Sequence, residues 1–229
     1  ILSNHTQYPE YSFLDLTDEM PKMIAGWKKL EIEFDAIYTG YLGSPRQIQI
    51  VSGFIDDFRR EDTLIVVDPV LGDNGRLYAG MTKEMVIEMR VLARRADVLT
   101  PNLTEAAFLT GIPYQAECYS EEYIQSLVKG LAALGAPQIV LTGISFDETT
   151  CPYLPAHYPG TGDAFTSVVT GALLQGDSLP VALDRAAQFI LQGIRATFGY
   201  QGDNREGILL ERVLPNLNLP IQSSTYELL

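Results

Sequence analysis

The sequence has little cysteine, little histidine and few basic residues. Its 229 residues include two cysteines and two histidines, and the cysteines, Cys118 and Cys151, form no C-x-x-C pair. A structural zinc site is therefore close to excluded, and a reduced intracellular protein fits better than a disulfide framework. Lys and Arg number 16 against 29 Asp and Glu, which gives a formal charge of −13. Since so acidic a chain repels phosphate backbones and anionic lipids, we expect no nucleic-acid and no membrane partner.

Long apolar runs and a leader are also missing. No uninterrupted apolar run reaches 18 residues, so no membrane-spanning helix is expected. Residues 1–6 lack the positive and apolar regions of a secretory signal. They also lack an initiator Met, which predicts that the chain begins inside a longer protein.

What is present is an ordinary globular composition, with 46% hydrophobic and 20% charged residues. This is enough apolar material to bury a core without disulfides or metals. The length suits one large α/β domain or two small ones. Because we find no internal repeat and no low-complexity linker, we predict a single domain over residues 1–229.

Short apolar, β-branched runs alternate with segments of helical spacing at least four times. The run at 64–67 is apolar on both faces, as in a buried parallel strand. The other predicted strands lie at 34–38, 98–99 and 138–141. The predicted helices lie at 18–30, from 45 onward, 82–94, 104–109, 120–134, after 160–162, 179–197 and 205–213. This order predicts an α/β fold with three layers (αβα), in which helices flank both faces of a mostly parallel central sheet.

Residues with hydroxyl side chains precede several of these helices and are expected to cap them. Thr17, Ser44 and Thr104 are the predicted N-caps, and Pro45 takes the first helical position after Ser44. Gly111 is predicted to end the helix that Thr104 begins.

Polar or glycine-rich residues follow four predicted strands. In open α/β sheets the ligand lies beyond the carboxyl ends of the strands, so a convergence of such residues favours a site. The segments are Thr39-Gly40-Tyr41, Asp68 to Asp73, Thr100-Pro101-Asn102 with Glu105, and Thr142-Gly143.

The segment Gly160-Thr161-Gly162-Asp163, immediately before a predicted helix, is the most informative. Two glycines allow a close backbone approach, and the N–H groups and dipole of a helix start form an anion site. A carboxylate there repels phosphate, but it is useful if it removes a proton from a hydroxyl that attacks phosphate. The alternative is that Asp163 is only a favourable first-turn carboxylate. The segment matches neither a Walker A loop nor G-x-G-x-x-G.

Asn102 and Glu105 lie three residues apart and are expected on one side of a helix start. An amide and a carboxylate there could hold Mg²⁺ through water. A capping box, with Asn102 as the N-cap, explains the same spacing equally well.

Several separated motifs together resemble the pyridoxal/pyridoxamine kinases of the ribokinase-like superfamily. They occur in family order and span most of the chain. The motifs are Leu2-Ser3-Asn4-His5-Thr6, Thr39-Gly40-Tyr41-Leu42-Gly43, Asp68-Pro69-Val70-Leu71-Gly72-Asp73, Thr100-Pro101-Asn102-Leu103-Thr104-Glu105 and Gly160-Thr161-Gly162-Asp163. The first and third are the more specific, whereas the last two are shared across the superfamily.

The resemblance implies ATP-dependent phosphorylation of the 5′-hydroxymethyl group of a vitamin B6 vitamer. It implies that Asp163 is the catalytic base and that Gly160, Thr161 and Gly162 form the anion hole. The residues it implies for the nucleotide are Asp68, Asp73, Asn102 and Thr142, and those for Mg²⁺ are Glu105 and Asp68. The implied vitamer contacts are His5, Thr6, Tyr41 and Tyr78.

The resemblance further implies ATP and Mg²⁺ as cofactors, with a monovalent cation left open, and a cytoplasmic homodimer. The chain departs from the family pattern in two places. The family has a strand and a helix before the motif at 2–6, and both are absent from this sequence. The stretch 146–153 is also short for the strand, turn and strand that the family has there.

Three other functions compete with this interpretation. Hydroxymethylpyrimidine (phosphate) kinases of the same superfamily usually carry Cys where this chain has Asp163, so Asp163 and the motif at 2–6 favour the B6 vitamers. A sugar kinase fits less well, since there is no room for a lid before the first motif. A non-catalytic vitamer-binding module is the alternative of a different class, and ATP consumption on adding pyridoxal distinguishes it.

Overall fold

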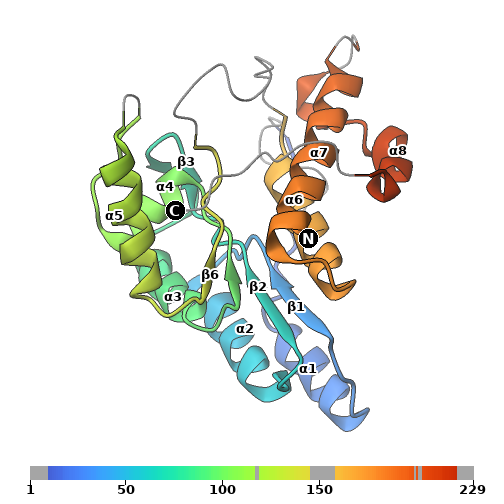
Figure 1. Cartoon of the computed structure of the whole chain (residues 1–229). Coiled ribbons are helices and arrows are strands. Elements are labelled where there is room, and N and C mark those ends of the chain that lie inside the picture. The colour runs from blue at the N-terminus through green and yellow to red at the C-terminus, as the bar shows by residue number, and fades with distance from the viewer. Residues whose placement is uncertain (1–9, 117–118, 145–157, 199, 201–202, 221–229) are drawn as a thin grey trace. The chain divides into compact units, whose positions relative to one another are not determined.

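Figure 1 shows the computed structural model of the chain, which describes residues 10–116, 119–144, 158–198, 200 and 203–220. The described chain separates into two compact units, one of residues 15–146 and one of residues 1–14 and 147–229. Each unit has its own hydrophobic core. No helix among the described residues is long and apolar enough to cross a membrane.

The unit of residues 15–146 is built on a four-stranded parallel sheet in the order β1–β2–β5–β6 (Figure 1). The strands are β1 (Ala36–Thr39), β2 (Leu64–Val67), β5 (Val98–Leu99) and β6 (Gln138–Ile139). The predictions for 64–67 and 98–99 are confirmed, and the first strand lies one to two residues later than predicted. The last strand is shorter than predicted, although a parallel bridge between Asn102 and Thr142 continues its pairing with the segment that follows β5.

Five helices belong to the same unit, and α4 is buried on most sides. They are α1 (Met20–Lys29), α2 (Pro45–Phe58), α3 (Lys83–Ala93), α4 (Leu103–Thr110) and α5 (Glu121–Ala132). Fully buried Ile48 and Ile55 of α2 meet Ile65 and Leu99 of the strands in this core, with Met89 of α3. Burial of such side chains stabilises the unit by roughly 1.5–3 kcal/mol each. Together they hold the carboxyl ends of the strands in fixed positions.

The helix caps agree with the sequence at Ser44 but not at two other positions. Ser44 accepts a hydrogen bond from the Gln47 N–H, and Pro45 is the first residue of α2, as predicted. The prediction for Thr17 was wrong, because α1 begins after Glu19 and Thr17 donates its hydroxyl to Asp15 instead. The prediction for Thr104 was also wrong, because Asn102 is the N-cap of α4.

A hairpin that the sequence analysis missed follows β2. Its strands are β3 (Gly72–Asp73) and β4 (Arg76–Leu77), joined by Asn74 and Gly75. Both turn residues have positive φ, 51° and 72°, as a two-residue turn of type I′ requires. The Asn-Gly dipeptide is the strongest short-range hairpin signal and could have revealed this element.

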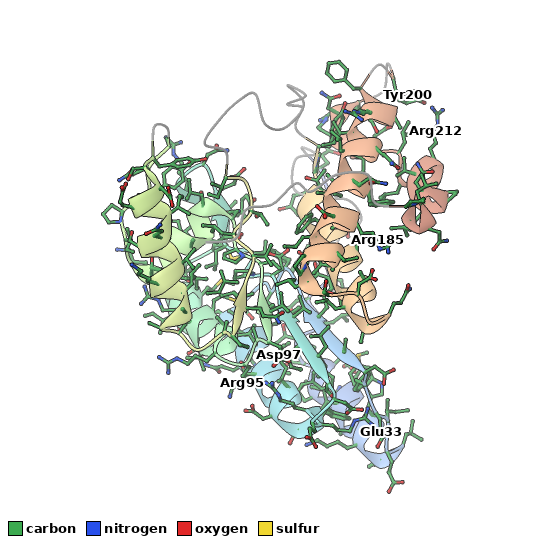
Figure 2. The ribbon with its side chains drawn as sticks, in the orientation of Figure 1. Glu33, Arg95, Asp97, Arg185, Tyr200 and Arg212 are labelled. Atoms are coloured by element: carbon green, nitrogen blue, oxygen red, sulfur yellow. The ribbon has the colours of Figure 1, made fainter. Side chains whose placement is uncertain are left out.

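Ion pairs occupy the amino ends of the strands, opposite the predicted site. Asp97, just before β5, accepts the Ile65 N–H at 2.8 Å and pairs with Arg59. Arg95 pairs with Asp56 at 2.6 Å, and Figure 2 labels Arg95 and Asp97 side by side at this end of the sheet. Since these groups satisfy one another, this end is structural and the carboxyl ends are left for ligands.

The second unit contains the helices α6 (Thr161–Leu174), α7 (Leu179–Thr197) and α8 (Leu210–Val213), with short 3₁₀ segments at Asn204–Glu206 and Leu214–Asn218. Its core includes Val169 of α6 and Ala182 and Ala186 of α7. The prediction for 179–197 is confirmed. The predicted helix over 205–213 was wrong in extent, because Gly207, with a φ of 79°, interrupts it. Figure 2 shows Arg212 of α8 beside Tyr200, where the guanidinium lies 5.6 Å from the ring centroid.

Candidate active site

The N-terminus of α4 is closed by a capping box. The Asn102 side chain accepts the Glu105 N–H at 2.9 Å, and the Glu105 carboxylate accepts the Asn102 N–H at 2.8 Å. Glu105 also accepts the Leu71 N–H at 3.1 Å, and the Asn102 amide donates to the Gly72 carbonyl at 2.9 Å. Of the two interpretations that the spacing left open, the capping box is therefore present, and the same side chains tie the hairpin to the helix.

Glu105 is a buried carboxyl group with an unusual pKa. Only 3% of the residue is exposed, and loss of hydration raises the pKa to about 8, with the negative charge of Asp68 acting in the same direction. The N–H donors of Asn102 and Leu71 oppose this rise. Asp68 is itself buried at the carboxyl end of β2. Two carboxyl groups buried beside each other are costly unless a cation or a shared proton compensates their charge.

The oxygen ligands at this edge suit a hard cation, but they do not enclose one. Within the described ranges, no group of three or more His, Cys, Asp or Glu side chains could hold a metal ion. Asp68 and Glu105 provide two carboxylates. Mg²⁺ in phosphate-transferring enzymes is typically bound by one or two carboxylates together with water and substrate phosphates. Their number matches such a Mg²⁺ site, and both Glu105 oxygens already accept N–H groups, from Leu71 and Asn102.

Three of the predicted nucleotide residues line one polar cavity of about 240 Å³. Asp73 reaches it from the hairpin, Asn102 from the start of α4, and Thr142 from the end of the last strand. The full lining is Asp73, Asn74, Asn102, Leu103, Thr104, Tyr114, Ala116, Tyr119, Thr142 and Gly143. Asp68, just after β2, and Glu105, in the first turn of α4, are not among the residues that line it.

A larger cavity of about 340 Å³ in the same unit is apolar. It lies between α1, β1 and α2, and no charged residue lines it. Thr39 and Gly40 at the end of β1 belong to this lining, next to Tyr41 in sequence. Phosphate chemistry therefore fits the polar cavity and not this one.

The start of α6 carries the remaining predicted groups and lies in the second unit. Gly160 is the N-cap, with a φ of 80° that favours glycine, and no side chain caps the helix. The hydroxyl of Thr161 donates to the Tyr158 carbonyl at 3.1 Å. A Cβ at Gly162 would meet nothing within 4 Å. The first N–H groups of the helix have no intrahelical acceptor, so they are available to an anion.

Asp163 lies in this first turn, as the sequence predicts. Its side chain is accessible, while the surrounding protein removes part of its hydration and raises its pKa above the ordinary value. A carboxylate whose pKa is raised toward neutrality is a better proton acceptor during catalysis. The charge, the open helix start and the raised pKa are what a general base beside an anion site requires.

The predicted vitamer contacts are only partly within the described residues. His5 and Thr6 lie outside them. Tyr41 follows β1 and is 52% exposed, and Tyr78 follows β4 and is 45% exposed. The exposed Tyr41 ring, just beyond the carboxyl end of β1, is available to stack on a planar ligand.

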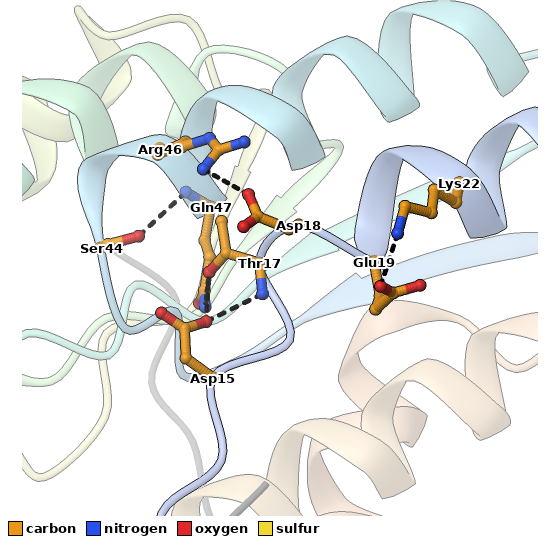
Figure 3. A network of polar contacts seen from close by, with 8 residues as sticks. All are labelled: Asp15, Thr17, Asp18, Glu19, Lys22, Ser44, Arg46 and Gln47. Carbon is orange, nitrogen blue, oxygen red and sulfur yellow. Dashed lines mark hydrogen bonds and ion pairs between the residues drawn. The ribbon is translucent and has the colours of Figure 1, made fainter.

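The loop that carries Tyr41 is fixed by a residue that the sequence analysis missed. The Gln47 side chain accepts the Gly43 N–H at 2.7 Å and donates to the Thr17 hydroxyl at 2.8 Å. Figure 3 shows the contact of Gln47 with Thr17, which also bonds to Asp15, and the ion pair of Asp18 with Arg46 at 2.7 Å. Only the position of Gln47 in the first turn of α2, four residues after Gly43, hinted at such a contact.

Comparison with known proteins places the chain in a family. The phosphomethylpyrimidine kinase family matches residues 28–206. The chain belongs to this family. A Bacteroides thetaiotaomicron protein with a provisional assignment as a phosphomethylpyrimidine kinase, solved with pyridoxal, is 62% identical, with a TM-score of 0.93 over 100% of this chain and 86% of that one.

Two pyridoxal kinases of known structure are also similar. The enzyme of Lactobacillus plantarum is 33% identical, with a TM-score of 0.85 over 94% of this chain and 82% of that one. The enzyme of Leishmania donovani, solved with ADP and pyridoxamine, is 25% identical, with a TM-score of 0.84 over 97% of this chain and 84% of that one. The family and fold predictions are thereby confirmed: the chain is a ribokinase-like kinase with a three-layer α/β fold.

Proposed function

We propose that the protein transfers the γ-phosphate of ATP to the 5′-hydroxymethyl group of pyridoxal, pyridoxamine or pyridoxine, as in vitamin B6 salvage. The observation that carries the proposal is the start of α6, where Gly160 in the left-handed region opens the helix without a side-chain cap and Asp163 follows in the first turn. The pyridoxal in the structure of a 62% identical relative supports the choice of vitamer.

In the proposed reaction Asp163 accepts the proton of the vitamer hydroxyl. The hydroxyl oxygen then forms a bond to the γ-phosphorus while the bond to the β,γ-bridging oxygen breaks, and ADP leaves. The N–H groups at Gly160, Thr161 and Gly162 donate to the oxygens of the transferring group, where negative charge is spread in the transition state. Gly162 lets this group approach, since no side chain stands in the way.

We place the nucleotide phosphates by the polar cavity, where Asp73, Asn102 and Thr142 meet. The ADP in the Leishmania donovani enzyme supports a nucleotide in this fold. Asp68 and Glu105 would hold Mg²⁺, which neutralises phosphate charge when bound. Without a cation, the carboxylates at this edge would repel the phosphates.

The decisive assay is phosphorylation of purified protein with pyridoxal, pyridoxamine, pyridoxine and hydroxymethylpyrimidine side by side. We expect turnover of at least one B6 vitamer with ATP and Mg²⁺, and loss of turnover in EDTA. Exclusive use of hydroxymethylpyrimidine would replace this function by that of a hydroxymethylpyrimidine (phosphate) kinase, the second candidate, which the description of the matching family supports. Vitamer binding without ATP consumption would indicate a non-catalytic module.

Tyr41 tests the vitamer side of the proposal. Tyr41→Ala removes the exposed ring and should weaken vitamer binding by about 1–2 kcal/mol, because stacking area is lost, while ATP affinity stays unchanged. Tyr41→Phe retains the ring and serves as the control. Equal losses for both ligands would contradict the assignment.

A cytoplasmic homodimer remains part of the proposal, and sedimentation at enzyme concentrations tests its stoichiometry.

A further inference from the structure

The β3–β4 hairpin is attached to the rest of its unit at the turn as well as at its base. At the base, the Gly72 carbonyl accepts the Asn102 amide at 2.9 Å. At the turn, the Gly75 N–H donates to the hydroxyl of Thr104 at 2.9 Å. Thr104 is 2% exposed and lies in the first turn of α4, so this acceptor is held in place by the helix.

The turn also rests on an aromatic ring. A Cβ added at Gly75 would lie 2.5 Å from the Tyr114 ring, closer than real side chains approach. Gly75 is therefore in close contact with Tyr114, and its φ of 72° independently disfavours other residues. Neither contact is needed to form a two-residue turn, since Asn74 and Gly75 satisfy its geometry by themselves. The contacts fix where the turn lies.

Asp73 precedes this turn directly. Its carboxylate accepts hydrogen bonds from the Asn74 backbone and side chain, at 2.8 and 3.1 Å, so its orientation follows that of the turn. Asp73 and Asn74 line the polar cavity, whereas Gly75 does not. A shift of the turn would carry both cavity residues with it.

We propose that Thr104, with Tyr114 beneath the turn, is a positioning residue for the nucleotide site: it holds the Asn74-Gly75 turn so that Asp73 and Asn74 face the polar cavity. This inference rests on the proposed function, because it takes the cavity to receive nucleotide phosphates. Thr104 acts through the hairpin, by accepting the Gly75 N–H, and it also lines the cavity itself.

The test compares Thr104→Val, which keeps the shape but removes the acceptor, with Thr104→Ser, which keeps the hydroxyl. ADP binding is measured by titration calorimetry, together with the KM values for ATP and vitamer and the melting temperature. We expect Thr104→Val to weaken ADP binding about threefold to tenfold, from the loss of one hydrogen bond, and to raise the KM for ATP alike. The vitamer KM should stay constant, and Thr104→Ser should bind ADP like the wild type.

A second pair of variants changes residues that do not themselves line the cavity. Gly75→Ala meets the Tyr114 ring at a φ of 72°, whereas Gly135→Ala has an even less favourable φ of 115° but open space around its Cβ. Both variants strain the backbone, but only Gly75→Ala should weaken ADP binding. This pair separates displacement of the turn from a general loss of stability.

Unchanged ADP binding in Thr104→Val and Gly75→Ala, with a wild-type enzyme that binds ADP and phosphorylates a vitamer, would overturn the inference and leave the proposed function intact. An equal loss in Gly135→Ala and Gly75→Ala would also overturn it, since strain alone would then suffice. A wild-type protein that neither binds ADP nor consumes ATP would overturn the proposed function itself.

Discussion

The helices α4 and α6 begin in opposite ways. At α4 the N-cap Asn102 and Glu105 satisfy each other's N–H groups, and the Glu105 carboxylate is buried. At α6 the N-cap is Gly160, no side chain caps the helix, and Asp163 is accessible. Both starts contain a carboxylate in the first turn, so the residue type does not separate them. The difference teaches that a first-turn carboxylate can either cap its own helix, as Glu105 does, or stay accessible beside uncapped N–H groups, as Asp163 does.

The largest expected effect comes from removing the accessible carboxylate of Asp163. Asp163→Asn keeps the shape of the side chain but cannot accept the proton, so kcat should fall about 10²–10⁴-fold with little change in the vitamer KM. If Asp163 only stabilised the helix, kcat would stay normal and stability would fall by roughly 0.3–1 kcal/mol. Steady-state kinetics and a melting curve on this one variant decide between the two roles.

The buried Glu105 carboxyl group should affect how the free energy of unfolding depends on pH. The folded pKa of Glu105, about 8, lies above its ordinary value of 4.5, so between these values the folded chain keeps a proton that the unfolded chain has released. The free energy of unfolding therefore falls as pH rises through this range, by at most about 1.4 kcal/mol per pH unit. Glu105→Gln has no such proton and lacks this slope.

Urea unfolding in EDTA at several pH values measures the difference. The free energy of unfolding of Glu105→Gln minus that of the wild type should increase by about 2 kcal/mol as the pH rises from about 5.5 to 7.5. A difference between the two proteins that does not change with pH reports only the hydrogen bonds that Glu105 makes with Leu71 and Asn102. Parallel curves for the two proteins would show that the Glu105 carboxylate is already ionised in the folded chain.

The smallest expected effect concerns Gly162, at the uncapped start of α6. A Cβ at Gly162 meets nothing within 4 Å, so Gly162→Ala should stabilise α6 by about 0.5 kcal/mol through helix propensity. If the transferring phosphoryl group approaches this backbone, the same methyl group should lower kcat about tenfold. The variant would then be more stable and less active than the wild type.

Gly171 offers the matched control within the same helix. Its Cβ position is equally open, and it lies more than two turns from the helix start. Gly171→Ala should stabilise α6 to a similar extent and leave kcat unchanged. Full activity in Gly162→Ala would show that no ligand approaches the backbone there, and the anion hole would have to be placed elsewhere.

The sequence by itself determined the elements whose signals are local. The β-branched run 64–67, the Ser44-Pro45 start of α2 and the bounds of α7 follow from propensity, capping and periodicity, and the structure agrees with them. The glycines and carboxylate at 160–163 indicated an anion site with a base, because these properties belong to the chain at that point. Their catalytic roles remain predictions.

Only the tertiary structure decided which polar residues share a cavity and which satisfy one another. Asn102 and Thr142 are far apart in sequence and meet because parallel strands end at one edge of the sheet, and the β3–β4 hairpin brings Asp73 to the same cavity. Glu105 became a buried cap with a pKa of about 8 through its burial and the charge of Asp68. The contact of Thr104 with Gly75 spans 29 residues. Such partners depend on the packing of distant segments, which no spacing within a motif records.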